Sequence, residues 1–398
     1  LFANANSARD VLEVISQWHD SDANSIAFAR FVCHYLYPDA NAKPKPAVEG
    51  GGGSDHIHFD KAGYYLVVDT TPFNHGDFDH AYNSFLLMVT RDNWNVPITP
   101  KAEKPSVKKE VFDNFDNQDG TSTGGFGSSA DHAINEKFQF QLIAKLPAGR
   151  DEGRAYDYYD KYSVIFHDTL SEGITYDGPD SVVIKSNNNT HDTTIDPSKY
   201  TIDTKNLENQ NYFEVNIHDV KACAKDAGFD LNDGATITFT YTAHLNEKAT
   251  VNTTSGPTDN KNSVQLQYSN NPRPGDYWGT TPKSEVYVFT YQLNNTKYHD
   301  DDNPNNVLAG AGFRLYSNKD CTEEQEIKLK KNTTDGTYSP YFGTDAGDEM
   351  FSDEHGQFNV KGLDAGTYYL KETKTPDGYS ACKVIPVTIK ADHSRNDQ

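Results

Sequence analysis

The 398-residue chain is poor in sulfur, with four cysteines and two methionines. No two cysteines form a Cys-x-x-Cys pair, which argues against zinc and dithiol redox sites. Apolar residues make up only 35% of the chain, and no apolar run approaches the roughly 18 residues needed to cross a bilayer. Acidic residues (58) outnumber lysine and arginine (36), so the net charge is −22. This charge argues against nucleic acid as a partner, because a phosphate backbone demands a basic surface.

Several enzyme motifs are also missing. The glycines at 50–53 are not followed by Gly-Lys-Ser/Thr, as a phosphate loop requires, and no Gly-x-Ser-x-Gly elbow occurs. On a strand, His56, His58 and Asp60 would share one face and could hold a metal ion, although a solvated strand face explains the same pattern. A carbohydrate-active enzyme would need two carboxylates across a cleft, and no segment indicates such a pair. We therefore predict no enzyme, metal or cofactor.

Aromatic residues, by contrast, are plentiful, with 24 tyrosines and 21 phenylalanines. A disordered chain would lack them, so the composition indicates several small cores under a polar surface. The length predicts two or three domains. A Pro- and Lys-containing connector at 96–105 marks one boundary. We expect an N-terminal domain over 1–100, a middle domain over 101–290 and a C-terminal domain over 291–398.

The spacing of apolar residues predicts the elements within these domains. A helix is expected to begin after Ser7, and a second helical stretch at 25–36 carries Cys33, most simply as a buried core thiol. A short helix is expected at 220–227. Alternating patterns predict strands at 63–69, 84–90, 138–143, 162–166, 181–184, 212–217, 235–242, 263–268, 286–293, 312–316, 356–360, 366–372 and 383–389. The fold class is therefore mainly β, with tandem β-sandwiches after an α+β N-terminal domain.

One carboxylate occupies a position that the pattern assigns to a core. Alternation places Tyr368, Leu370 and Glu372 on the same apolar face of a strand. A carboxylate on a core face is costly unless it is paired or protonated. A place at the solvated end of the sheet explains the pattern equally well.

The segment around Glu372, Tyr-Tyr-Leu-Lys-Glu-Thr-Lys-Thr-Pro-Asp-Gly-Tyr at 368–379, resembles the E-box of sortase-assembled pilin shaft subunits of Gram-positive bacteria. Residues 308–315 resemble an early strand of their CnaB-type C-terminal domain. Residues 105–111 and 264–272 resemble the first and last strands of their CnaA-type middle domain, and 63–69 resembles part of their N-terminal domain. The resemblance implies Ig-like domains and a structural subunit of a covalently polymerised, cell-wall-anchored pilus that serves adhesion and colonisation.

The family locks its domains with intramolecular isopeptide bonds, each joining a lysine amine to an asparagine carboxamide with help from a buried acid. The lysine must be neutral and the acid protonated, and an apolar pocket favours both forms. In the middle domain, strand alternation directs Lys109 and Asn270 inward. The resemblance adds Asp168 as the assisting acid. Lys109 alone is also explained as a surface lysine whose stem covers apolar residues.

For the C-terminal domain the resemblance implies Glu372 as the acid and Lys297 as the lysine. The asparagine partner normally lies near the Leu-Pro-x-Thr-Gly sorting signal, a motif that does not occur in this sequence. Relatives also begin with a strand-rich segment before the helices, so we expect more chain at both ends. Some relatives close a disulfide here, which implies Cys321 with Cys382, and two free thiols are the alternative.

Sortase joins a lysine that precedes the middle domain to the C-terminal threonine of the next subunit. Lys101 stands at that place, with Lys104 as second choice, and a plain Pro/Lys linker is the alternative. The implied partners are other copies of the chain, sortase, and tip and base subunits of a surface pilus. The alternative function is an adhesin that binds host glycan or matrix through its N-terminal domain, with His56, His58, Tyr64 and Tyr65 as candidates.

Overall fold

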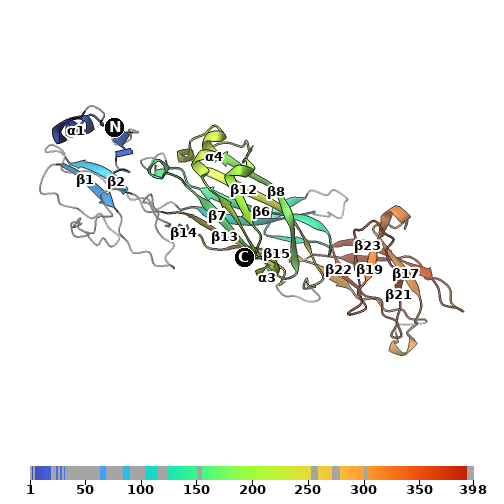
Figure 1. Cartoon of the computed structure of the whole chain (residues 1–398). Coiled ribbons are helices and arrows are strands. Elements are labelled where there is room, and N and C mark those ends of the chain that lie inside the picture. The colour runs from blue at the N-terminus through green and yellow to red at the C-terminus, as the bar shows by residue number, and fades with distance from the viewer. Residues whose placement is uncertain are drawn as a thin grey trace.

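The structure is a computed structural model in which groups of β-sheets follow one another along the chain (Figure 1). It describes residues 2, 5–18, 24, 25, 27, 28, 31, 104–114, 124–149, 155–251, 259–270, 278–299 and 303–391, and the backbone of 63–68 and 84–89. None of the helices within these ranges is long and apolar enough to cross a membrane.

The N-terminal region combines a helix and a strand pair. Helix α1 (Ala8–Ile15) begins at a capping box, in which the Ser7 hydroxyl accepts from the Asp10 amide at 3.2 Å and the Asp10 carboxylate accepts from the Ser7 amide at 2.9 Å. Strands β1 (Gly63–Val68) and β2 (Ser84–Val89) pair antiparallel. These elements agree with the predicted α+β character of this region.

The described residues between 104 and 289 form two facing sheets, here called the middle sandwich. The first sheet has the order β4–β3–β6–β12–β8–β9 and comprises β3 (Ser106–Asp113), β4 (Gly125–Gly127), β6 (Lys137–Leu146), β8 (Ile174–Ser186), β9 (Thr193–Thr194) and β12 (Ala235–Leu245). The second has the order β10–β11–β7–β13–β15–β5, with β14 beside β13. It comprises β5 (Ser129–Asp131), β7 (Val164–Leu170), β10 (Tyr200–Asp203), β11 (Tyr212–Ile217), β13 (Lys261–Ser269), β14 (Trp278–Thr280) and β15 (Ser284–Phe289).

Short helices cover the connections of this sandwich: η2 (Ala155–Tyr158), η3 (Pro197–Lys199), α3 (Leu207–Gln210), α4 (Val220–Asp226) and η4 (Leu231–Asp233). The core between the sheets is rich in aromatic rings. The ring of Tyr241 on β12 lies 5.3 Å from those of Phe140 on β6 and Phe213 on β11, so the rings bridge the two sheets.

The described residues between 291 and 389 form a smaller pair of sheets with its own core, here called the C-terminal sandwich. One sheet has the order β16–β22–β20–β19, from β16 (Tyr291–Leu293), β19 (Leu329–Lys331), β20 (Tyr338–Pro340) and β22 (Val360–Leu363). The other has the order β18–β17–β23–β24 with β21 beside β17, from β17 (Gly312–Tyr316), β18 (Glu326–Ile327), β21 (Met350–Phe351), β23 (Gly366–Lys374) and β24 (Ile385–Ile389). Two short helices, η5 (Pro304–Asn306) and η6 (Glu323–Gln325), lie in its loops.

The two sandwiches meet at a tight joint. The Ile134 amide donates to the Gly362 carbonyl at 2.9 Å, and the Thr290 hydroxyl donates to the Leu363 carbonyl at 3.2 Å. Gly362 has a φ of +84°, and a β-carbon there would lie only 2.4 Å from the Ile134 side chain. Glycine at this position therefore permits both the backbone turn and the close approach.

The predicted mainly β class with tandem sandwiches is confirmed. Several predicted strands differ in extent. The strand expected at 356–360 overlaps the observed β22 only at Val360. The strand expected at 162–166 continues as β7 to Leu170, because its alternation of buried and exposed residues runs on through Asp168. The strand expected at 286–293 is divided at Thr290 into β15 and β16, which belong to different sandwiches.

Candidate functional site

A buried polar cluster lies between the sheets of the middle sandwich, and Lys109 on β3 supplies its amine. Residues along β3 alternate between exposed and buried, so Lys108 faces solvent while Lys109 is only 1% exposed. The Lys109 backbone amide donates to the Ser284 hydroxyl at 2.9 Å, which ties β3 to β15 of the opposite sheet. The strand geometry thus directs a lysine side chain into an aromatic core.

Asp168 receives the lysine amine. It lies within β7, where it pairs with Phe213 on β11 and Val264 on β13, and it is fully buried. Lys109 Nζ forms an ion pair with Asp168 Oδ2. The same Nζ lies 5.2 Å from the centre of the Phe140 ring, so the pair is enclosed by aromatic surface. The residues that the sequence assigned to the amine and the acid are therefore in direct contact.

Tyr241 connects this pair to an asparagine. Its hydroxyl accepts from Lys109 Nζ at 3.2 Å, donates to Asp168 Oδ1 at 3.3 Å, and accepts from Asn262 Nδ2 at 2.6 Å. These three bonds use the full capacity of a phenol. Asn262 lies on β13 with 0% exposure, and its Oδ1 is buried without a hydrogen-bond partner. An unsatisfied buried amide oxygen is costly and calls for an explanation.

Burial shifts both ionisable groups of the pair toward their neutral forms. It lowers the pKa of Lys109 to about 8, and the neighbouring Asp168 only partly opposes this change. It raises the pKa of Asp168, against the opposing effect of Lys109 and Tyr241. A neutral amine can act as a nucleophile, and a protonated carboxyl can donate a proton. The site therefore favours the two protonation states that amide exchange requires.

The structure does not bring the predicted partner Asn270 into this cluster. Asn270 is buried and faces inward as alternation predicts, but it follows the far end of β13. It is six residues beyond Val264, the residue that pairs with Asp168, and at about 3.4 Å per residue that is roughly 20 Å along the strand. Asn262 is two residues from Val264. Asn262 was not among the predicted residues, although alternation along β13 also directs its side chain inward.

A second lysine–carboxylate pair lies in the C-terminal sandwich. Lys297 Nζ is 3.1 Å from Glu372 Oε2, and the same oxygen accepts from the Cys382 amide at 2.7 Å. The Phe313 ring lies 5.8 Å from Lys297 Nζ. Glu372 Oε1 is buried without a hydrogen-bond partner. Glu372 on β23 is therefore a core residue paired with the predicted lysine, and not a solvated residue at a sheet end.

The two acids differ in electrostatics. Burial tends to raise the pKa of Glu372, but the hydrogen bond from the Cys382 amide and the nearby Lys297 together hold the pKa below its ordinary value. Within the described part of the chain, no asparagine contacts this pair. The C-terminal pair thus has an amine and an acid, without the third member that the middle sandwich provides.

Cys321 and Cys382 are both free thiols, so the implied disulfide is absent. Cys321 follows the end of β17 that carries Tyr316, and its Sγ is directed to the Lys319 carbonyl at 3.6 Å. The Cys382 amide donates a hydrogen bond to the Glu372 carboxylate. Glu372 pairs with Phe313, which lies near the other end of β17. A disulfide requires α-carbons within about 7 Å, and positions at opposite ends of β17 do not meet that requirement.

Several predicted positions lie outside the described residues. These are the linkage candidate Lys101, the core thiol Cys33, and the alternating residues His56, His58 and Asp60. Only the backbone is described at Tyr64 and Tyr65, in β1. Lys104 is described and half-buried just before β3. The sortase lysine and the adhesin alternative therefore stay predictions.

Solved structures share this arrangement of sandwiches. The chain superposes on a 35 kDa C-terminal fragment of the major pilin GBS80 of Streptococcus agalactiae with a TM-score of 0.52 and 23% identity, covering 72% of this chain and 91% of that one. The full-length major pilin SpaD of Corynebacterium diphtheriae gives a TM-score of 0.52 and 20% identity over 82% of this chain and 70% of that one. The fold is that of a major pilin.

Within this pilin fold, residues 293–397 match the SpaA family of prealbumin-like fold domains. The match covers the C-terminal sandwich, including Lys297 and Glu372. No curated protein matches the chain. The similarity therefore identifies the pilin fold and its C-terminal domain type, and the buried cluster around Lys109 is the feature from which chemistry can be argued.

Proposed function

We propose that the chain is a shaft subunit of a covalently polymerised surface pilus, and that its middle sandwich carries an isopeptide bond between Lys109 and Asn262. The single observation that supports this best is the buried cluster of amine, carboxyl, phenol and carboxamide between two sheets. The pilin fold supports the same role. The reaction occurs once per molecule, so the chain is a structural protein that modifies itself.

The chemistry follows from the contacts. Proton transfer from the Lys109 ammonium to Asp168 yields a neutral amine and a neutral acid. The amine nitrogen attacks the carboxamide carbon of Asn262, whose Nδ2 is held by the Tyr241 hydroxyl, and Asp168 passes the proton from the attacking nitrogen to the leaving nitrogen. The C–N bond to the amide nitrogen then breaks and ammonia leaves. The product has an Nζ–Cγ amide bond and has lost one ammonia.

The bond would join the two sheets of the middle sandwich, because Lys109 lies on β3 and Asn262 on β13. It closes a loop of more than a hundred residues. By analogy with a disulfide, closing such a loop stabilises the folded state by roughly 5 kcal/mol through the entropy of the unfolded chain. Forming the bond would also replace the buried ion pair with a neutral amide and a protonated Asp168, while the Asn262 Oδ1 stays in place as the carbonyl oxygen of the new amide.

In the C-terminal sandwich we propose that Lys297 and Glu372 are the amine and the acid of a second bond. Their contact at 3.1 Å and the enclosing Phe313 ring repeat the arrangement around Lys109. The asparagine partner is proposed to come from outside the described residues. Because Glu372 is ionised in the present pair, the proton on Lys297 must pass to it before attack.

Polymerisation is proposed to occur through Lys101, or through Lys104, by a sortase that joins its amine to a threonine carboxyl of the next subunit. The decisive experiment is peptide mass spectrometry of native surface polymer. We expect a branched peptide in which Lys101 or Lys104 carries a C-terminal threonine of another copy. Monomeric chain with two unmodified lysines, together with glycan or matrix binding by the isolated chain, would instead support the adhesin.

A further inference from the structure

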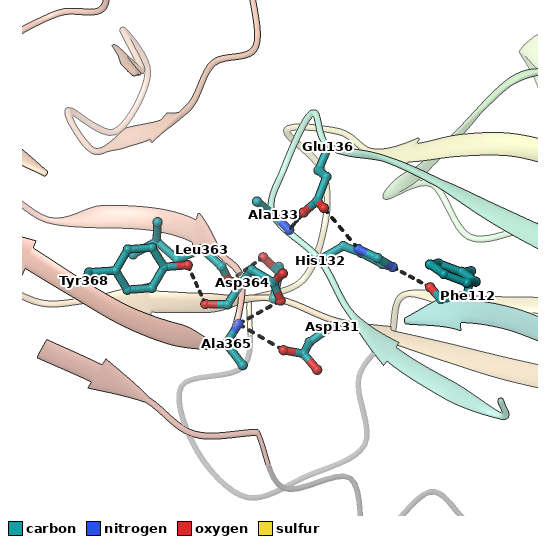
Figure 2. Close-up of polar contacts among 10 residues, drawn as sticks. Phe112, Asp131, His132, Ala133, Glu136, Leu363, Asp364, Ala365 and Tyr368 are labelled. Carbon is teal, nitrogen blue, oxygen red and sulfur yellow. Dashed lines mark hydrogen bonds and ion pairs between the residues drawn. The ribbon is translucent and has the colours of Figure 1, made fainter. Parts of the chain in front are cut away.

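A second polar cluster lies at the joint between the sandwiches (Figure 2). His132 and Glu136 come from the segment after β5 in the middle sandwich, and Asp364 follows β22 in the C-terminal sandwich. One ligand-type atom from each of these three side chains lies within 4.8 Å of the others. The cluster is separate from the Lys109 and Lys297 sites.

His132 provides a buried nitrogen that lacks a hydrogen-bond partner. Its side chain is fully buried, and Nε2 lies 2.7 Å from the Phe112 carbonyl. A carbonyl only accepts, so Nε2 carries the hydrogen and Nδ1 of the neutral ring has a lone pair. Nδ1 faces the Glu136 carboxylate at 3.6 Å, which is too long for a hydrogen bond (Figure 2). The ring is thus fixed in the tautomer that metal-ligating histidines adopt.

The two carboxylates are also held in place by backbone amides. The Ala133 amide donates to Glu136 Oε2 at 2.9 Å, which leaves Oε1 facing His132. The Ala365 amide donates to Asp364 Oδ1 at 2.7 Å and to Asp131 Oδ2 at 2.9 Å. Hydrogen bonds that orient ligating side chains are characteristic of metal sites.

We propose that His132, Glu136 and Asp364 bind a divalent metal ion of the Zn²⁺ or Mn²⁺ type. Two ligands at about 2.0–2.4 Å from one ion lie at most about 4–5 Å apart, which the present spacing meets. An imidazole nitrogen combined with carboxylate oxygens suits these ions, whereas Ca²⁺ and Mg²⁺ take oxygen ligands. Three protein ligands leave room for water, which reaches the site because Glu136 and Asp364 are only half-buried.

The ion would connect the two sandwiches, because two ligands belong to one and the third to the other. Existing contacts across the joint include hydrogen bonds such as Ile134 to Gly362 at 2.9 Å and Asn135 to Pro340 at 3.0 Å. A shared ion would add coordinate bonds to this set. The site therefore gives the joint a means of being stiffened by metal.

The test is isothermal titration calorimetry with Zn²⁺ on the full-length chain, after treatment with a chelator and blocking of the thiols. Mn²⁺ and Ca²⁺ are titrated in parallel. We expect one equivalent of Zn²⁺ or Mn²⁺ to bind, with Ca²⁺ at least about tenfold weaker. Glu136→Gln and Asp364→Asn should each weaken the binding about tenfold or more. Asp177→Asn is the matched control, because Asp177 Oδ2 contacts His244 Nδ1 at 2.8 Å in a histidine–carboxylate pair that contributes no ligand to the cluster.

Hydrogen exchange of the same proteins tests the bridging role. Amides of 132–136 and of 362–365 should both exchange more slowly when Zn²⁺ is added to the wild type and to Asp177→Asn, and neither should respond in Asp364→Asn. Circular dichroism checks that each variant is folded. No heat of Zn²⁺ or Mn²⁺ binding, binding unchanged in both Glu136→Gln and Asp364→Asn, or preference for Ca²⁺ would overturn the proposal.

Discussion

Asn262 Nδ2 donates a hydrogen bond of 2.6 Å to the Tyr241 hydroxyl, and that hydroxyl also accepts from Lys109 Nζ. The carboxamide and the amine are thus held on either side of one phenol oxygen. Asn270, which follows the end of the same strand, has no such contact. This relationship identifies Asn262 as the proposed partner and leads to the first prediction.

Asn262→Ala should abolish bond formation in the middle sandwich, whereas Asn270→Ala should leave it intact. Intact-mass measurement of the folded chain should show the loss of one ammonia per bond in the wild type and in Asn270→Ala. Asn262→Ala should lack that loss for this bond. A peptide in which Lys109 is joined to Asn270 would contradict the assignment.

Lys109→Ala and Asp168→Ala should each prevent the same bond, because one removes the nucleophile and the other the acid that takes its proton. Each also leaves a buried group without its partner, at a cost of about 3–5 kcal/mol. Loss of the cross-link destabilises each variant further. We therefore expect each variant to unfold at a markedly lower guanidinium concentration than the wild type. The surface variant Lys108→Ala serves as the control and should match the wild type in both mass and midpoint.

Tyr241→Phe should slow bond formation without abolishing it, because the phenol positions the carboxamide but neither attacks nor leaves. The variant loses the oxygen that accepts from Asn262 Nδ2 and Lys109 Nζ, and a misplacement of reacting groups by about 1 Å corresponds to roughly 10² in rate. The measurement is the time course of ammonia loss after refolding. A rate equal to the wild type would show that Tyr241 has only a packing role.

The unlinked pair should make stability depend on alkaline pH. Because burial lowers the pKa of Lys109 to about 8, against about 10.4 in an unfolded chain, the unfolded state binds more protons between these values. Stability of Asn262→Ala should therefore rise by about 2.5 kcal/mol from pH 8 to pH 10.4. Urea unfolding of Asn262→Ala across this pH range measures the rise in stability. The double variant Asn262→Ala with Lys109→Met should show no such rise. A flat profile in Asn262→Ala would contradict the lowered pKa.

Cys321 and Cys382 should react as free thiols in protein prepared without reductant. Cys382, the more exposed of the two, should be alkylated in the folded state, and the buried Cys321 only after unfolding. Non-reducing and reducing gels should show the same mobility. A mass lower by two hydrogens with both cysteines protected would show that the disulfide forms after all.

Strand alternation predicted which side chains of the two candidate sites face a core. A period of two assigns residues to faces, and it correctly separated buried Lys109 from exposed Lys108. It also placed Glu372 on the core face of β23. Faces are a local property of the backbone, so a single sequence contains that information.

Alternation does not predict which residues of neighbouring strands lie opposite each other. Asn262 and Asn270 have the same parity, and only the pairing of Val264 with Asp168 shows which of them lies level with Lys109. That register depends on contacts between strands far apart in the chain. The joint site was missed for the same reason, because His132 and Asp364 are separated by more than two hundred residues and meet only when both sandwiches are formed.

The directions of two strands carry a mechanical consequence. β3 and β15 are joined by the bond from the Lys109 amide to the Ser284 hydroxyl, and both run toward His132, whose ring contacts the Phe112 carbonyl and whose amide contacts the Phe289 carbonyl. In the proposed fibre, linked through Lys101 or Lys104, tension would enter before β3 and leave after β15 toward the C-terminal sandwich. Tension applied this way slides the two strands past each other instead of peeling them apart, so their contacts must fail together and not one after another.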